Sequence, residues 1–352
     1  MKVLVLNPGA TSTKISIFEE ENEVFKTNLV HHAADLAPYA HVIDQGPFRK
    51  QLILETVEKA GYQMTDFDAV CGRGGLLRHI PSGTYAVSDQ AIADVLDPPY
   101  GEHASNLGVL LARELGDMAG IPSFFVDPVC VDEMTPVAHV TGFKGMERES
   151  FFHALNQKSI ARKAAKLLGK TYEEARLIVI HMGGGVSVAA HENGLAVDDF
   201  NVKDEGAFGM DRAGSLPVNA MINLCFSGLT KQEVKKLLGS EAGAYSYVGT
   251  KDFREVERRA FEENDPDCRM VFDAMAYQLA KDIGAMAAVL KFQVDAIVYT
   301  GGMAYSDRFT QAITDYVGNL APVLRLPGEE EMRSLAEGAL RVLHGGQAKV
   351  YP

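Results

Sequence analysis

The sequence lacks several features that would place it outside the cytoplasm. It has no apolar run of about 18 residues, the length that a membrane-spanning helix needs, and an apolar strand begins at residue 3, where a signal peptide would have a basic segment. The four cysteines are scattered, with no CxxC pair: Cys71, Cys130, Cys225 and Cys268. Scattered cysteines predict reduced thiols, no zinc site and a cytoplasmic protein with no membrane partner.

Several common catalytic motifs are also absent. No G-x-x-x-x-G-K-[ST] is present, which excludes a P-loop enzyme, and no G-x-G-x-x-G opens a helix, which argues against a Rossmann dehydrogenase. G-x-S-x-G and H-E-x-x-H are missing too. The formal net charge of −13 does not indicate a nucleic-acid partner. Any phosphate binding must therefore depend on a different kind of loop.

The first eighteen residues contain such a loop. Residues 3–6 are a continuous apolar run typical of a buried strand, Asn7-Pro8-Gly9 breaks it, and residues 14–18 resume a strand with a period of two. Thr11, Ser12 and Thr13 occupy the tip. Free N–H groups and hydroxyls at such a tip, with Lys14 beside them, suit phosphate oxygens. An ordinary hairpin turn explains the stretch equally well.

Two later stretches repeat the pattern. Residues 177–190 are again an apolar run, a histidine, three glycines and a second strand. Residues 68–75 and 295–302 both read Asp-Ala-(Val/Ile), three residues, Gly-Gly. The two pairs predict a duplicated domain whose glycine tips face a common cleft.

The chain length of 352 residues favours two domains. Predicted strands alternate with predicted helices along the chain, which indicates an α/β fold with covered sheet faces. We place the domain boundary in an irregular stretch at residues 136–145 and expect domains at 1–148 and 149–329. The final helix, about 330–352, is a candidate to pack back on the first domain.

Six motifs, in one order, make the chain resemble the acetokinase family, and within it the butyrate kinase branch. They occupy residues 7–14, 72–77, 103–108, 152–158, 181–185 and 300–302. The resemblance runs nearly end to end. It implies two duplicated actin/ribonuclease H-like domains around a central cleft. It also implies a phosphotransferase that interconverts ATP and a short-chain carboxylate with ADP and an acyl phosphate, using Mg²⁺.

The chemistry agrees with the residue types. A carboxylate is ionised at neutral pH and is already the nucleophile, so the site needs cations for the carboxylate and for the transferring phosphoryl group. Arginine suits both tasks, and Arg73 and Arg212 stand in glycine-flanked loops. By similarity to the family, Arg73 binds the substrate carboxylate, Arg212 contacts the phosphoryl group, and Asp127 positions metal and substrate. The simpler alternatives are ion pairs for the arginines and a turn for Asp127.

The resemblance also implies contacts with metal and nucleotide. Asn7 and Glu330 match magnesium-contacting positions, although Glu329 and Glu331 adjoin Glu330 and leave the register open. The expected nucleotide-binding residues are Lys14, His181, Gly183, Gly184, Gly185, Asp252, Phe253, Arg254, Gly301 and Gly302. Asp252 has a second interpretation as a helix N-cap, and His181 one as a buried, satisfied histidine.

One stretch departs from the family pattern. Acetate kinases have Phe-His-Gly-Thr-Ser-His where this chain has Phe152-His-Ala-Leu-Asn-Gln157. Gln157 replaces the second histidine and can donate a hydrogen bond but carries no charge. Either the neutral donor suffices or another cation replaces it. We expect His153 and Gln157 near the substrate, and the change favours butyrate kinase over acetate kinase.

Two other functions stay open from the sequence. One is an acetate or propionate kinase, which would prefer two- or three-carbon acids. The other is a non-catalytic, ATP-dependent switch of the same superfamily, which would bind ATP without forming an acyl phosphate. Leu76, Leu77 and Val129 are candidates for the pocket of a longer acid. The resemblance further implies a homodimer or a higher homo-oligomer.

Overall fold

The computed structural model describes all 352 residues, in two compact units. Unit 1 contains Met1–Asp132 and Glu330–Pro352, and unit 2 contains Glu133–Glu329. The domain boundary expected at residues 148 and 149 stays a prediction. None of the helices combines the length and the hydropathy that a membrane crossing needs.

Unit 1 is built on a six-stranded mixed sheet in the order β3-β2-β1-β4-β6-β5. Its central strand β1 pairs with β2 antiparallel and with β4 parallel. The strands are β1 (Lys2–Pro8), β2 (Ser12–Glu19), β3 (Asn22–Val30), β4 (Ala69–Arg73), β5 (Thr84–Ala86) and β6 (Ser123–Val126). The buried strands read as apolar runs because both faces of the sheet are covered.

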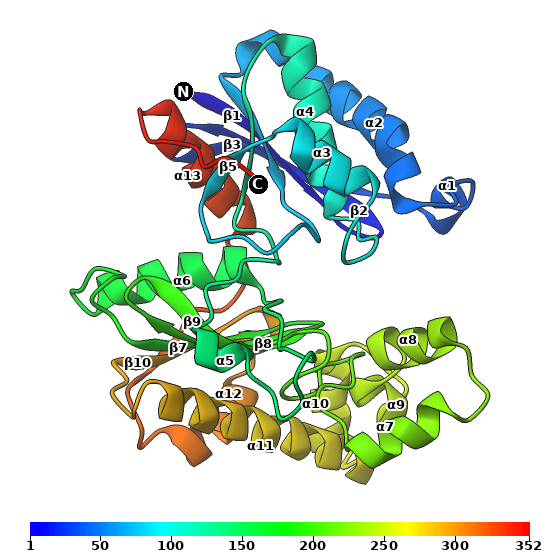
Figure 1. Cartoon of the computed structure of the whole chain (residues 1–352), viewed down its shortest axis with the longest axis vertical. Coiled ribbons are helices and arrows are strands. Elements are labelled where there is room, and N and C mark those ends of the chain that lie inside the picture. Colours follow the sequence, from blue (N-terminus) through cyan, green and yellow to red (C-terminus); the bar gives the residue numbers. More distant parts are fainter. The chain divides into compact units, whose positions relative to one another are not determined.

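Helices cover the sheet of unit 1. Leu4 and Leu6 of β1 pack with Ile53 of α2 (Gly46–Lys59) and with Leu107 and Leu111 of α4 (Asn106–Ala119). The C-terminal helix α13 (Glu331–Leu343) contacts β1, β4 and β6, and its Gly338 carbonyl accepts the Thr84 hydroxyl at 3.0 Å. Figure 1 shows α13, from the C-terminal end of the chain, in the same unit as β1, from the N-terminal end. Short α1 (Ala33–Leu36) and α3 (Asp89–Leu96) complete the unit.

Unit 2 is built on a five-stranded mixed sheet in the order β11-β10-β7-β8-β9. Its strands are β7 (Leu177–Met182), β8 (Val186–Glu192), β9 (Leu195–Phe200), β10 (Ala296–Thr300) and β11 (Val323–Arg325). Alternate residues of β7 face different helices: Leu177 and Val179 pack against α6 (Ala154–Leu167), and Ile178 and Ile180 belong to the core that contains α11 (Pro266–Val289). The remaining helices are α5 (Pro136–His139), α7 (Val218–Cys225), α8 (Lys231–Ser240), α9 (Gly243–Val248), α10 (Phe253–Phe261) and α12 (Asp307–Val317).

The two sheets have the same topology. β1, β2 and β3 correspond to β7, β8 and β9, each an antiparallel meander, and β4 and β6 correspond to β10 and β11, each parallel to the central strand. β5 is the one strand of unit 1 without a counterpart. The predicted duplication is thus confirmed: the chain is an α/β protein of two actin/ribonuclease H-like halves.

The duplication puts the glycine-rich turns at equivalent places. The β1–β2 turn contains Gly9, the β7–β8 turn contains three glycines, and a Gly-Gly pair directly follows β4 and β10. Because β4 and β10 run parallel to the central strands, each Gly-Gly lies at the same sheet edge as the hairpin turn of its own unit. Loops at the carboxyl ends of strands are the usual place for ligands in α/β proteins.

Candidate active site

The β7–β8 turn of unit 2 is a tight glycine loop. The Gly183 N–H donates to the Gly185 carbonyl at 3.0 Å, and the Gly184 carbonyl accepts the Met210 N–H at 3.3 Å. Gly301, at the end of β10, has φ of +85°, and a Cβ there would lie 2.4 Å from the Met182 carbonyl oxygen. Only glycine fits at Gly301, so the two strand ends approach each other closely.

Arg212 lies against this turn. Its Nη1 would be 3.2 Å from a Cβ at Gly185, and it donates to the Val202 carbonyl at 3.3 Å. No carboxylate pairs with Arg212 in unit 2. An arginine beside a glycine turn and without an acidic partner keeps its charge available for an anion.

A cavity of about 860 Å³ opens beside the same turn. It brings together three segments that are far apart in the sequence, the β7–β8 turn, the start of α10 and the segment after β10. The lining residues are Gly183, Gly184, Met210, Lys251, Asp252, Phe253, Arg254, Glu257, Gly302, Met303, Tyr305 and Ser306. Six of the ten predicted nucleotide-binding residues line it. Such a cavity has the size of a small-molecule site.

Asp252 also has the structural role considered from the sequence. Its Oδ1 accepts the Arg254 N–H at 2.9 Å and caps α10, and its carboxylate pairs with the Arg254 guanidinium. The Arg254 side chain is 90% exposed. The same carboxylate therefore starts the helix and lines the cavity.

His181 is buried at the end of β7. The Asn156 amide donates to its Nδ1 at 2.8 Å and reaches the Thr300 hydroxyl at 3.3 Å on the neighbouring strand. The His153 ring stacks on His181, with centroids 3.8 Å apart and planes at 12°. Two parallel imidazoles at this distance favour at most one positive charge between them.

Gln157 is fully buried, which was not expected for a substrate-binding residue. Its Nε2 donates to the Ser187 hydroxyl at 2.8 Å and to the Ser187 carbonyl at 3.2 Å, and its Oε1 faces His191 Nε2 at 3.1 Å. Both ends of the amide are engaged within the protein. The direct substrate contact predicted for Gln157 gains no support from this placement.

A second group of predicted residues meets in unit 1. Arg73, at the end of β4, forms a two-point ion pair with Glu331, with distances of 3.1 Å from Nη1 and 3.0 Å from Nη2. Asn7 Nδ2 donates to the same carboxylate at 2.7 Å, and its Oδ1 accepts from Arg73 at 3.3 Å. The acid that joins Asn7 and Arg73 is thus Glu331, one residue after the predicted Glu330. Glu329 lies in unit 2, 3.6 Å from His181 Nε2.

The oxygen atoms around Asn7 suit a magnesium ion. Asn7 and Glu331 supply an amide and a carboxylate oxygen that already converge on a cation, the Arg73 guanidinium. Mg²⁺ uses few protein oxygens and keeps most of its waters. This donor set would suit Mg²⁺, with Glu331 in the place expected for Glu330.

Asp127 terminates β6 in a strained conformation. It is buried with φ of +38°, its Oδ1 accepts the Gly83 N–H at 2.6 Å, and its own N–H donates to the Gly83 carbonyl at 3.1 Å. A non-glycine residue in the left-handed region at a strand end is often found at functional sites.

The β1–β2 hairpin has an unpredicted support. Lys14, which was predicted to bind the nucleotide, pairs with Asn7 across β1 and β2 of unit 1. The residues that line the cavity all belong to unit 2. Beneath the tip, the fully buried Arg49 donates to the carbonyls of Gly9 at 2.9 Å and Ser12 at 3.0 Å, and to Gln45. Burial lowers the pKa of Arg49 to about 10, so the side chain is still charged at neutral pH.

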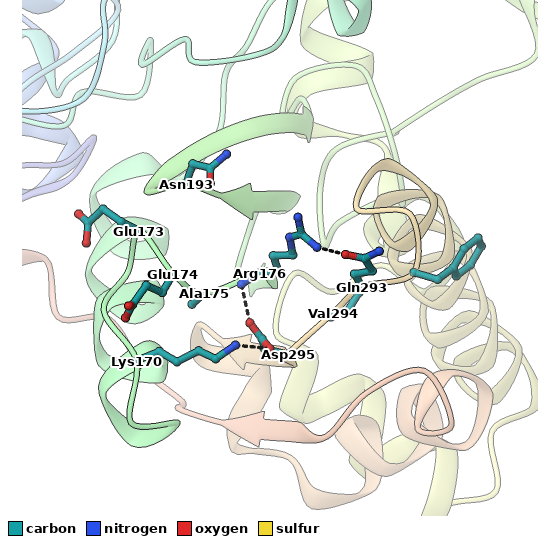
Figure 2. A pocket seen from close by; sticks show the side chains of 10 residues that line it. Lys170, Glu173, Glu174, Ala175, Arg176, Asn193, Gln293, Val294 and Asp295 are labelled. Carbon is teal, nitrogen blue, oxygen red and sulfur yellow. Dashed lines mark hydrogen bonds and ion pairs between the residues drawn. The ribbon is translucent and has the colours of Figure 1, made fainter.

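A second cavity, of about 560 Å³, lies at the start of β7 and β10, the sheet edge opposite the glycine turns. Charged residues that line it bond to one another: Lys170 pairs with Asp295 at 2.6 Å, and the Arg176 backbone N–H donates to the other Asp295 oxygen at 2.8 Å (Figure 2). We assign it no role in the site.

Sequence reasoning missed Arg49, Asn156, Ser187 and Thr300, and it left Glu331 open beside Glu330. Asn156, Gln157 and Lys158 are consecutive polar residues on the buried side of α6, and polar residues inside a buried helix were the available signal for Asn156. Arg49 gave no such signal, because a lone arginine in an amphipathic helix is normally exposed.

Comparisons with known proteins bear on the family and the fold. Residues 143–320 match the acetokinase family. Among solved structures, the chain is similar to an acetate kinase from Porphyromonas gingivalis, with a TM-score of 0.80 and 21% identity over 97% of this chain and 99% of that one. It is also similar to a propionate kinase from Francisella tularensis subsp. tularensis SCHU S4, with a TM-score of 0.75 and 17% identity over 96% of this chain and 98% of that one.

A more distant likeness links the chain to a ROK hexokinase from Thermus thermophilus, with a TM-score of 0.51 and 15% identity over 97% of this chain and 100% of that one. At such identities the solved structures establish the fold alone. The family match covers half of the chain, and it therefore establishes the family as well as the fold. The protein therefore belongs to the acetokinase family and is a short-chain carboxylate kinase of that family.

Proposed function

We propose that the protein is a butyrate kinase-type enzyme, which transfers the γ-phosphoryl group of ATP to butyrate or to a branched acid of four or five carbons. The observation that carries the kinase chemistry is Arg212, which lies against the Gly185 turn and has no acidic partner. The departure at Gln157 from the acetate kinase pattern supports the longer acid.

In this proposal, unit 2 holds the nucleotide. The cavity beside the β7–β8 turn takes ATP, with its apolar part, which includes Met210 and Phe253, against the base. The N–H groups of the glycine turn donate to phosphate oxygens. Arg212 then stabilises the charge that spreads over the phosphoryl oxygens during transfer.

The acid is held by unit 1. Arg73 presents a planar fork that matches a carboxylate, and Asp127 orients the groups at the adjacent strand end. The half-buried Leu76 and Val129 follow these two strands and offer apolar surface to an alkyl tail. Each buried methylene contributes about 0.8 kcal/mol, so discrimination between neighbouring chain lengths is modest.

The reaction balances without a proton transfer. A carboxylate oxygen forms a bond to the γ-phosphorus, the bond from that phosphorus to the β–γ bridging oxygen breaks, and ADP leaves with the electron pair. Because the acid is already ionised, positioning and electrostatics supply the catalysis. Mg²⁺, when bound at Asn7 and Glu331, would neutralise charge on the phosphates.

The proposal extends to the setting of the enzyme. ATP, ADP, the acid and the acyl phosphate are its small-molecule partners, and these metabolites suit a cytoplasmic location. A homodimer or a higher homo-oligomer belongs to the same proposal.

Acid-dependent release of ADP tests the kinase function. The protein is incubated with Mg-ATP, with and without butyrate, and ADP is measured by a coupled assay. The proposal predicts ADP formation only with the acid, and its loss in Arg212→Ala. ATP binding without acid-dependent ADP release would instead support a nucleotide-dependent switch.

A further inference from the structure

We propose that Gln157 is a positioning residue that, through Ser187, fixes the proton of His153 on Nε2. The half-buried His153 is thereby a neutral hydrogen-bond donor whose donating nitrogen is the one away from Ser187. The link to catalysis depends on the proposed kinase function, but the proton position does not.

The first step is the orientation of the Gln157 amide. Its nitrogen lies 3.2 Å from the Ser187 carbonyl oxygen. A carbonyl can only accept, so the NH₂ group must face it and the amide cannot be flipped. The amide oxygen then faces His191 Nε2 at 3.1 Å, and this nitrogen must carry a proton.

The second step concerns His191 and Tyr172, which lie beyond the Gln157 amide oxygen in this chain of hydrogen bonds. His191 is completely buried, and burial lowers its pKa to about 3, so the ring is neutral at physiological pH. With the proton on Nε2, its Nδ1 accepts the Tyr172 hydroxyl at 2.8 Å. The donor directions therefore run from Tyr172 through His191 to Gln157.

The third step is the hydroxyl of Ser187, which is 1% exposed. It accepts two N–H groups, from Gln157 Nε2 at 2.8 Å and from the His153 backbone at 3.3 Å. A hydroxyl oxygen has two lone pairs and one proton. The remaining contact, His153 Nδ1 at 2.8 Å, must therefore receive the hydroxyl proton.

The result is a neutral His153 with its own proton on Nε2. If Nδ1 were protonated, the buried hydroxyl of Ser187 would have three donors facing it and no acceptor for its own proton, which is unfavourable in a buried place. His181, stacked on His153, is held in the same way, because the Asn156 amide donates to its Nδ1. The stacked pair avoids two adjacent charges while each ring keeps an Nε2–H donor.

This hydrogen-bond network offers a physical reason for Gln157 at the position where acetate kinases have a histidine. A histidine at that position would have to be placed in the correct tautomer to continue the network, whereas the glutamine amide supplies an acceptor at one end and a donor at the other. In the proposed kinase, the His153 Nε2–H donates to a substrate oxygen without adding a charge.

Long-range ¹H–¹⁵N NMR of the ligand-free protein near pH 7 tests the proton position. His153→Gln identifies the His153 signals by their loss. We expect an unprotonated Nδ1 and a protonated Nε2. In Gln157→Met and in Ser187→Ala, the Nδ1–H form should become populated. Ser187→Ala removes only a hydroxyl and serves as the safer variant for folding.

Thr314→Val is the matched control, because it removes a hydrogen bond to Tyr299 elsewhere in unit 2 and should leave the His153 signals unchanged. A protonated Nδ1 in the unchanged protein, or the same tautomer in both network variants, would overturn the proposal. Steady-state kinetics of Gln157→Met and Ser187→Ala add a second readout. In both variants kcat should fall about 10-fold, the effect of one lost hydrogen bond, with little change in the KM for ATP.

An altered tautomer with unchanged kcat would overturn the positioning role. The two proposals can also fail separately: a chain with the expected tautomer but no acid-dependent ADP release would contradict the kinase and leave the proton position intact.

Discussion

Arg73 and Glu331 face each other as a matched fork, with two nitrogens of the guanidinium on two oxygens of the carboxylate at 3.1 and 3.0 Å. The Glu331 side chain is 7% exposed, and Asn7 holds it from the other side at 2.7 Å. Glu331 therefore occupies the two nitrogens that a substrate carboxylate would use in the same geometry. The proposal requires the acid to displace Glu331 from this fork.

Removal of the Arg73 guanidinium should weaken acid binding most. A lost charge-assisted contact costs about 1.5–3 kcal/mol, so the KM for the acid should rise about 10- to 100-fold in Arg73→Ala. Initial rates at varied acid concentration measure this. Arg78→Ala is the control, since Arg78 lies in the same loop but pairs with Asp94 and is half exposed. Equal KM values in both variants would contradict the assignment of Arg73.

Arg212 should act on turnover. We expect Arg212→Ala to lower kcat about 100-fold or more while the KM for the acid changes little, because the cation is assigned to the transferring phosphoryl group. Arg269→Ala is the matched control, since this guanidinium is exposed, pairs with Asp273 on the same helix and does not line the cavity. A similar kcat in Arg212→Ala and the unchanged enzyme would remove Arg212 from the mechanism.

Arg49 should be essential to the β1–β2 tip. Arg49→Met leaves the carbonyls of Gly9 and Ser12 without their donors in a buried place, so the free energy of unfolding should fall by about 3 kcal/mol or more. Denaturant titration measures the change. Lys59→Met, on the same helix, removes a side chain that is 80% exposed and 3.8 Å from Glu55, and should cost less than about 1 kcal/mol. Equal losses would show that Arg49 does not support the tip.

Asp282 should make stability depend on pH. It accepts the Ala207 N–H at 2.6 Å, and burial raises its pKa to about 6. A carboxyl whose pKa is higher in the folded protein binds its proton more readily there, so the unfolding free energy falls as pH rises from about 4 to 6 and stays low above. Asp282→Asn keeps the acceptor and removes the charge.

We therefore expect Asp282→Asn to be more stable than the unchanged protein at pH 7.5, by about 1–2 kcal/mol because the side chain is only partly buried, and similar to it at pH 4. Thermal unfolding at both pH values tests this. A variant that is less stable at pH 7.5 would show that the ionised carboxylate stabilises the loop that carries Arg212.

The sequence predicted the architecture because duplicated motifs mark duplicated strands. The apolar runs at the start of the two repeated stretches, residues 3–6 and 177–180, identified both central strands. The final helix was expected at about residues 330–352, and the structure has it at Glu331–Leu343. The short helices α1, α5 and α9 were not predicted, since four to six residues are too few for a periodic pattern.

The site was less predictable, because the contacts depend on the fold. Three consecutive glutamates at residues 329–331 have the same local sequence signal, and only the helix register separates Glu331, which contacts Asn7, from its neighbours. Gln157 was expected near the substrate because of its position in a motif. Its burial against Ser187 and His191 follows from the packing of α6 on the sheet, which no local pattern encodes.

The acid preference tests the central claim most directly. The protein is incubated with Mg-ATP, hydroxylamine and one acid at a time from acetate to hexanoate, and the acyl hydroxamate is measured. We predict the highest kcat/KM at four or five carbons, with Arg212→Ala as the blank. A maximum at acetate would contradict the butyrate assignment while keeping the carboxylate kinase. No hydroxamate with any acid would contradict the kinase mechanism itself.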